Sequence, residues 1–84
     1  MTQVQKLIKL AEKIGLGIIP AEEALLELRN YTEVQSEVAE VVHFLYHFLA
    51  DADIRAKDAE YSEEQQRHFH QMVEVLNQVS AGLD

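Results

Sequence analysis

The chain contains no cysteine, which excludes a disulfide-stapled scaffold, a thiolate zinc site and a cysteine nucleophile. It has one proline and three glycines, so few positions interrupt a helix. Its longest apolar run, 41–50, contains two histidines and is far shorter than the roughly 20 residues that a membrane-spanning helix needs. No targeting signal is visible, so we expect a helical protein of the cytoplasm that does not enter a membrane.

Basic side chains are scarce: 7 Lys and Arg stand against 15 Asp and Glu, for a net charge of −8. Nucleic-acid binding draws most of its affinity from Lys and Arg on phosphate, so we expect no nucleic-acid partner. The 84 residues predict a single domain, residues 1–84, and the 48% hydrophobic content excludes a disordered acidic tail. This composition favours a compact acidic domain, and its charge is compatible either with a basic protein partner or simply with good solubility.

The hydrophobic periodicity predicts an all-α fold, a small antiparallel bundle of four helices with a short second member. A Thr-x-x-Gln capping box opens the first helix at Thr2, and Gly15 is expected to end it. Pro20 is expected in the first turn of the short second helix, and Arg29 and Asn30 are expected to end it.

Two further capping boxes, at Thr32 and Ser62, are expected to open the third and fourth helices. The segment 51–60 between them either continues the third helix or breaks near Asp58. The fourth helix carries apolar residues at alternating spacings of three and four, which is typical of a bundle seam: Phe69, Met72, Leu76, Val79 and Leu83.

Histidines are the candidates for metal chemistry. His43 and His47 project from one face of the third helix, Asp51 continues that face, and a hairpin would bring His68 to a similar depth. These four side chains make a ligand set for a divalent metal, so a metal-binding bundle is one alternative function. The pair lacks the Glu of the His-Glu-x-x-His motif, and about 100° per residue turns both imidazoles away from the apolar stripe. Solvated histidines and no cofactor are therefore the favoured interpretation.

Acidic residues gather around the junction of the last two expected helices. Residues 1–13 carry a net charge of +2, and the remaining 71 residues carry −10. Those 71 residues therefore have a strongly negative electric field, which suits a basic partner. Tyr61 is a candidate aromatic anchor at the helix junction, because tyrosine is enriched at binding hot spots. The other interpretation is a solvated helix end with local ion pairs to Arg55 and Lys57. The predicted partner-binding residues are Asp51, Asp53, Asp58, Glu60, Tyr61, Glu63 and Glu64.

Catalysis finds little support in the sequence. No serine lies in a nucleophile-elbow motif, and no pattern indicates a desolvated cleft that would separate the pKa values of two carboxylates. We therefore expect no enzyme. Val42 and Tyr46 extend the apolar surface of the third helix beyond its main stripe, so a homodimeric structural or regulatory protein joined through this flank is a second alternative. The chain is accordingly expected to be a monomer or a homodimer.

Residues 7–14 read LIKLAEKI, a Gly-x-Gly-x-Ile link follows at 15–19, and then comes Pro20-Ala21-Glu22-Glu23 with leucines behind it. This N-terminal third of the chain resembles the opening of small bacterial immunity proteins of the colicin D type. The resemblance implies an all-helical, acidic, cytoplasmic protein that neutralises a basic tRNA-cleaving toxin by covering its active site with acidic side chains. It transfers no individual binding residue. The leading hypothesis is thus a small acidic protein-binding module that inhibits a basic nuclease toxin.

Overall fold

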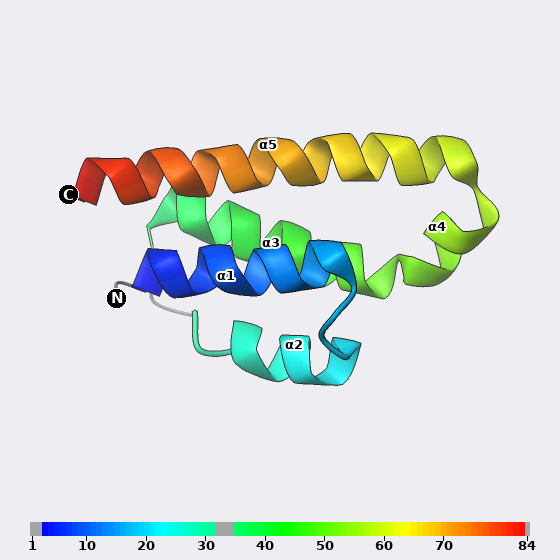
Figure 1. Ribbon diagram of the computed structural model, residues 1–84, viewed down its shortest axis with the longest axis horizontal. Coiled ribbons are helices and arrows are strands. Elements are labelled where there is room, and N and C mark those ends of the chain that lie inside the picture. The colour runs from blue at the N-terminus through cyan, green and yellow to red at the C-terminus, as the bar shows by residue number, and fades with distance from the viewer. Residues whose placement is uncertain (1–2, 32–34, 84) are drawn as a thin grey trace.

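The computed structural model describes residues 3–31 and 35–83, which form helices and no β-strand (Figure 1). This confirms the all-α fold class. The expected number of helices is wrong, because the described residues form five where four are expected. The five are α1 (Gln3–Leu16), α2 (Ala21–Leu28), α3 (Ser36–Ala50), α4 (Ala52–Lys57) and α5 (Ala59–Leu83). The capping residues expected at Thr2 and Thr32 lie outside the described residues.

The additional helix, α4, forms within the segment 51–60. Asp51 leaves the helical path with φ −92° and ψ 11°, and Asp58 breaks it again with an extended φ of −130° and ψ of 105°. The carboxylate of Asp58 accepts the N–H of Tyr61 at 3.1 Å, so Asp58 caps α5. The capping box expected at Ser62 is therefore wrong, because α5 has already begun and the Ser62 N–H donates to the Asp58 carbonyl at 3.0 Å.

Gly17 ends α1, two residues after the expected Gly15. Gly17 has φ +69°, a left-handed conformation that glycine adopts without strain. Its N–H donates to the carbonyl of Ile14 at 3.1 Å, and the N–H of Ile18 donates to the carbonyl of Lys13 at 3.1 Å. These two bonds are the Schellman pattern, which satisfies carbonyls that the end of a helix leaves unpaired.

Gly15 serves the contact between α1 and α5 instead. A Cβ atom built on Gly15 would lie 2.9 Å from Cε1 and 3.0 Å from Cζ of Phe69. Phe69 is only 8% exposed, and its ring centroid lies 4.9 Å from that of Phe48. Because the ring is held in the core, α1 can approach α5 this closely only where it carries no side chain.

Pro20 directly precedes α2 and does not occupy its first turn as expected. It has φ −61° and ψ 143°, and its carbonyl accepts the N–H of Ala24 at 3.0 Å as the first bond of the helix. Glu22 and Glu23 lie in the first turn, where the positive end of the helix dipole stabilises carboxylates. The helix ends at Leu28, in agreement with the sequence.

The helices α1, α3 and α5 lie lengthwise beside one another, and the chain returns along α5 after it turns at α4 (Figure 1). The contact between α3 and α5 is the most extensive. Across the described residues, no helix combines the length and the hydropathy that a membrane span requires.

Helix α4 contributes no buried residue. The core joins the other four helices, and its largest fully buried side chains are Leu7, Leu28, Val38, Val41, Leu45 and Leu76.

The flank of α3 that the sequence offers for a homodimer is covered by the chain itself. Val42 is 7% exposed and belongs to the core, and Tyr46 is half-buried against that core. These two side chains are packed within one molecule. Val42 therefore offers almost no surface to a second chain, and the homodimer through this flank stays a prediction.

Candidate functional site

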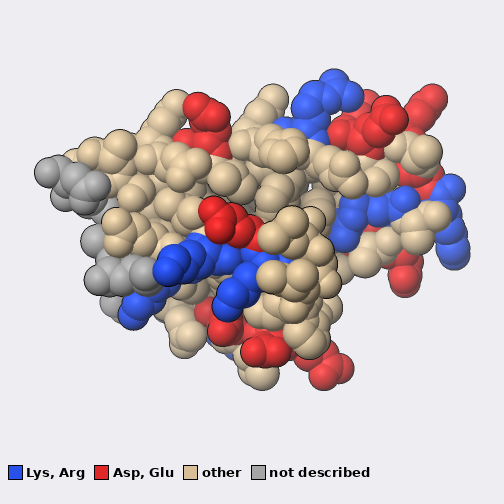
Figure 2. All heavy atoms as spheres, viewed as in Figure 1, with Lys and Arg blue, Asp and Glu red and all other residues tan. Residues whose placement is uncertain are grey.

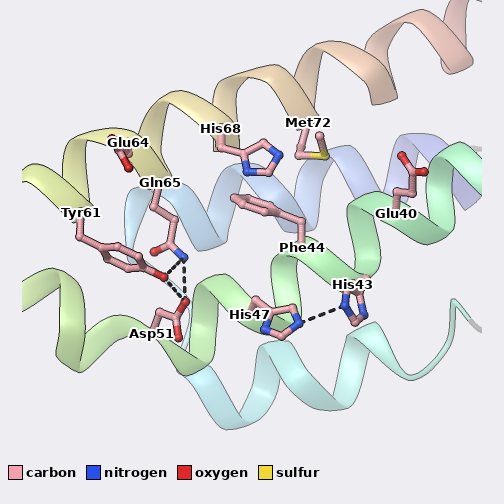
Figure 3. A pocket seen from close by; sticks show the side chains of 10 residues that line it. All are labelled: Glu40, His43, Phe44, His47, Asp51, Tyr61, Glu64, Gln65, His68 and Met72. Carbon is pink, nitrogen blue, oxygen red and sulfur yellow. Dashed lines mark hydrogen bonds between the residues drawn. The ribbon is translucent and has the colours of Figure 1, made fainter.

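A groove of about 620 Å³ lies between α3 and the N-terminal half of α5 (Figure 3). Phe44, Gln65 and Met72 form part of its walls. In the part of the chain that the structure describes, no Lys or Arg lines the groove, so the formally charged side chains of its walls are carboxylates. Its titratable lining side chains are Glu40, Asp51, Glu64, Tyr61, His43, His47 and His68.

Asp51 closes one end of the groove and is held there by two donors from α5. The Tyr61 hydroxyl donates to Oδ2 of Asp51 at 2.5 Å, and Nε2 of Gln65 donates to the same oxygen at 3.0 Å (Figure 3). The Tyr61 hydrogen bond is the main cause that lowers the pKa of Asp51, and the same bond raises the pKa of Tyr61. Asp51 is therefore a fixed, ionised carboxylate at neutral pH.

Arg55, on α4, supports the end of the groove at which Asp51, Tyr61 and Gln65 meet. Its Nη1 donates to Oε1 of Gln65 at 2.5 Å and also to the backbone carbonyl of Phe48. Its guanidinium carbon lies 3.7 Å from the centroid of the Phe48 ring, a cation–π contact. Burial lowers the pKa of Arg55, although an arginine stays charged at any physiological pH. One side chain of α4 thus ties the end of α3 to α5.

Gln65 is the centre of this network. It is 8% exposed and is the only buried polar side chain among residues 3–31 and 35–82. Its amide oxygen accepts from Arg55 and its amide nitrogen donates to Asp51, so both ends of the amide are paired. Sequence reasoning missed Gln65 as a site residue because it placed this side chain in a capping box. Arg55 was treated only as a surface cation.

His43 and His47 lie on consecutive turns of α3, on the same face, and both are exposed as the helical spacing predicts. Their Nε2 atoms are 3.0 Å apart in a hydrogen bond, and their ring centroids are separated by 4.5 Å at an interplanar angle of 74°. His68 enters the groove from α5, and its ring centroid lies 4.5 Å from that of Phe44 (Figure 3). The groove therefore brings all three of these histidines to one surface.

The four-residue metal site considered from the sequence is not assembled. Among the described residues, no three His, Cys, Asp or Glu side chains converge closely enough to hold a metal ion. His68 is engaged with Phe44 on the opposite wall, and Asp51 is turned toward Tyr61 and Gln65. Of that set, only His43 and His47 have nitrogen atoms in mutual contact.

The predicted acidic surface separates into two parts. Asp51, Tyr61 and Glu64 line the groove, and two of these three are tied to each other. The other predicted carboxylates are exposed outside the groove, on α4, at the break between α4 and α5, and on the first turns of α5: Asp53, Asp58, Glu60 and Glu63. At this end of the molecule Figure 2 shows Lys and Arg atoms interleaved with those of Asp and Glu. The charge there is mixed, whereas the charged side chains that line the groove are all carboxylates.

Comparison with known proteins gives no relative. No family model, no curated protein and no solved structure matches this chain. The resemblance of the N-terminal third to colicin D-type immunity proteins therefore stays a prediction. What the groove binds must be inferred from its own residues.

Proposed function

We propose that this protein is a small acidic binding module that captures a basic protein partner and seats a Lys or Arg side chain of that partner in the α3–α5 groove. The observation that carries the proposal is the composition of the groove. Three carboxylates, Glu40, Asp51 and Glu64, line it, and among the described residues no cation does. A groove with charges of one sign and low-dielectric walls concentrates ions of the opposite sign.

The fixed position of Asp51 suits it to this role. A carboxylate accepts about four hydrogen bonds, and the two bonds that hold Asp51 both use Oδ2. Oδ1 therefore remains for a cation that enters the groove. Because Tyr61 and Gln65 hold the carboxylate in place, binding does not have to immobilise it, and less conformational entropy is lost.

The walls of the groove also match the stem of a basic side chain. Phe44 and Met72 supply apolar surface beside the carboxylates. Lys and Arg bury their methylene stems along apolar surface while the charged head keeps polar partners. An acidic peptide has no such match, because its carboxylates would face Glu40, Asp51 and Glu64 at close range.

The remaining predicted carboxylates act at longer range. Asp53, Glu60 and Glu63 are exposed at the same end of the molecule as Asp51. Together with the net charge of −8 they speed the encounter with a positive partner, an effect that salt screens. In this proposal the helices act as an antiparallel bundle in the cytoplasm. The protein inhibits a basic nuclease toxin, as the N-terminal resemblance implies.

A peptide titration tests the groove directly. An arginine-rich peptide added to the ¹⁵N-labelled chain should shift the amide signals of α3 and of the first half of α5, and a glutamate-rich peptide should not. Glu64→Gln and Glu40→Gln should each weaken binding, whereas Glu74→Gln, an exposed carboxylate of α5 outside the groove, should not. Binding that maps elsewhere, or that ignores ionic strength, would contradict the proposal.

The inhibitor role needs its own assay. Purified protein is mixed with the tRNA-cleaving domain of a colicin D-type toxin, and the cleavage of tRNA is followed with time. Protection that is lost in the Glu64→Gln variant supports inhibition through the groove. Unchanged cleavage at saturating protein removes this toxin as the partner, while the peptide titration still tests cation capture.

A further inference from the structure

The histidine pair on α3 has a geometry that points to a ligand of its own. Imidazole nitrogens bind first-row divalent metals at about 2.0–2.1 Å. Two such bonds that span the 3.0 Å between Nε2 of His43 and Nε2 of His47 enclose an angle of about 94° at the metal.

We propose that His43 and His47 form a two-histidine chelate for Cu²⁺, with Ni²⁺ as the weaker substitute. An angle near 90° belongs to neighbouring positions of a square-planar or tetragonal ion, the geometry that Cu²⁺ and Ni²⁺ prefer with nitrogen ligands. Cu²⁺ stands highest among these ions in affinity for nitrogen sites. A closed structural zinc site needs four protein ligands, and the described residues bring no third one to this pair.

The surroundings favour a cation at this position. Both imidazoles are exposed on consecutive turns of α3, so the backbone already sets their spacing and solvent ligands can complete the coordination. Glu40 and Asp51 line the same groove on either side of the pair along α3. Their charges raise the local concentration of divalent cations without the need for direct contact.

Metal binding replaces the hydrogen bond within the pair. In the metal-free pair one Nε2 carries the proton that the other accepts. In the chelate both neutral imidazoles carry their proton on Nδ1, so that both Nε2 atoms present lone pairs to the metal. The exchange needs only a change of tautomer and a small ring rotation, and the helix stays as it is.

A titration of the full chain with Cu²⁺, supplied as its glycine complex near pH 7.5, tests the site by calorimetry and electron paramagnetic resonance. His43→Gln and His47→Gln should each weaken Cu²⁺ binding about 100-fold, because loss of one of two linked contacts removes the chelate. His70→Gln is the matched control, since His70 is exposed on α5 outside this groove. It should leave the affinity unchanged, and His68→Gln should do the same.

A measurement on the unaltered chain gives an independent readout. Cu²⁺ should broaden the ring signals of His43 and His47 before those of any other histidine. Retained affinity in either α3 variant would overturn the proposal, as would equal losses in the His70 or His68 variants. Tighter binding of Zn²⁺ than of Cu²⁺ would also overturn it, since Cu²⁺ stands above Zn²⁺ in affinity for a site made of two imidazoles.

Discussion

The substitution Gly15→Ala has two opposite effects on stability: it raises the helix propensity of α1, and it brings a new methyl group against the ring of Phe69. Alanine favours a helix over glycine by at most about 1 kcal/mol, and Gly15 lies in the last turn of α1, where this gain is smallest. The new Cβ would meet the ring edge of Phe69 at 2.9 Å, closer than ordinary packing allows. Overpacking of this kind costs about 1–3 kcal/mol. The clash therefore outweighs the propensity, and we expect a net loss of about 1 kcal/mol of unfolding free energy.

The ring of Phe69 decides this outcome because its packing against two other rings resists displacement. It packs on Phe48 with centroids 4.9 Å apart and on Phe44 with centroids 6.3 Å apart, so movement of one ring displaces the others. A loss of about 1 kcal/mol lowers the Tm of a domain of this size by about 4–8 °C. Urea unfolding followed by circular dichroism measures the same change as a shift of the midpoint with an unchanged slope.

Two controls make the Gly15 prediction sharp. Gly82→Ala places a methyl group in open space on α5 and should leave the stability unchanged or slightly raise it. In a double-mutant cycle with Phe69→Leu, the cost of Gly15→Ala should fall, because the ring edge has been removed. If Gly15→Ala stabilises the protein as Gly82→Ala does, the close approach of α1 to α5 is refuted.

Four further predictions concern the cap of α5, the hydrogen bond between Asp51 and Tyr61, and the core. Asp58→Ala should cost about 0.5–2 kcal/mol in urea unfolding because it removes the cap of α5, while Ser62→Ala should change little. The lowered pKa of Asp51 means that its contribution to stability, present above the ordinary value of 3.8, is lost as the pH falls through the lowered pKa. The raised pKa of Tyr61 means that its contribution to stability, present below the ordinary value of 10.0, is lost as the pH rises through the raised pKa; this alkaline loss, measured as stability against pH, should be smaller in Tyr61→Phe, and Tyr31, whose pKa burial also raises, supplies the remainder. Leu76→Ala should cost about 2–5 kcal/mol, measured by thermal unfolding, because Leu76 is fully buried.

The helices could be predicted from the sequence because their apolar periodicity is a local property. The signals at their ends were less reliable. Gly15 and Gly17 are both plausible helix stops, and what separates them is the ring of Phe69, which lies more than fifty positions further along the chain. Ser62 and Gln65 have the spacing of a capping box, but tertiary contacts with Arg55 and Asp51 take the amide of Gln65.

The candidate site was likewise predictable only where it depends on the local spacing of residues along one helix. The shared face of His43 and His47 follows from their spacing of four residues, and the structure confirms both the shared face and the exposure. The groove itself depends on which residues of α5 face α3, and this is a matter of packing between the two helices in which Gln65, Phe69 and Leu76 are buried. No local pattern indicates that Tyr61 turns toward Asp51, so the sequence treated both as exposed contact residues.

The short helix α4 has a thermodynamic consequence for the groove. Six residues are too few for a helix to persist in water, and α4 buries none of its side chains, so its order depends on the hold of Arg55 on Phe48 and Gln65. We expect the amides of α4 to exchange with solvent through a local opening that leaves the core folded. We expect that opening of α4 also frees the hydrogen bond between Asp51 and Tyr61. The groove then exists in two states, closed and able to bind or open and unable to, whose equilibrium is separate from global unfolding. A change at Arg55 should therefore loosen this end of the groove and weaken binding there, in addition to the cost of leaving the buried Gln65 amide oxygen without its donor.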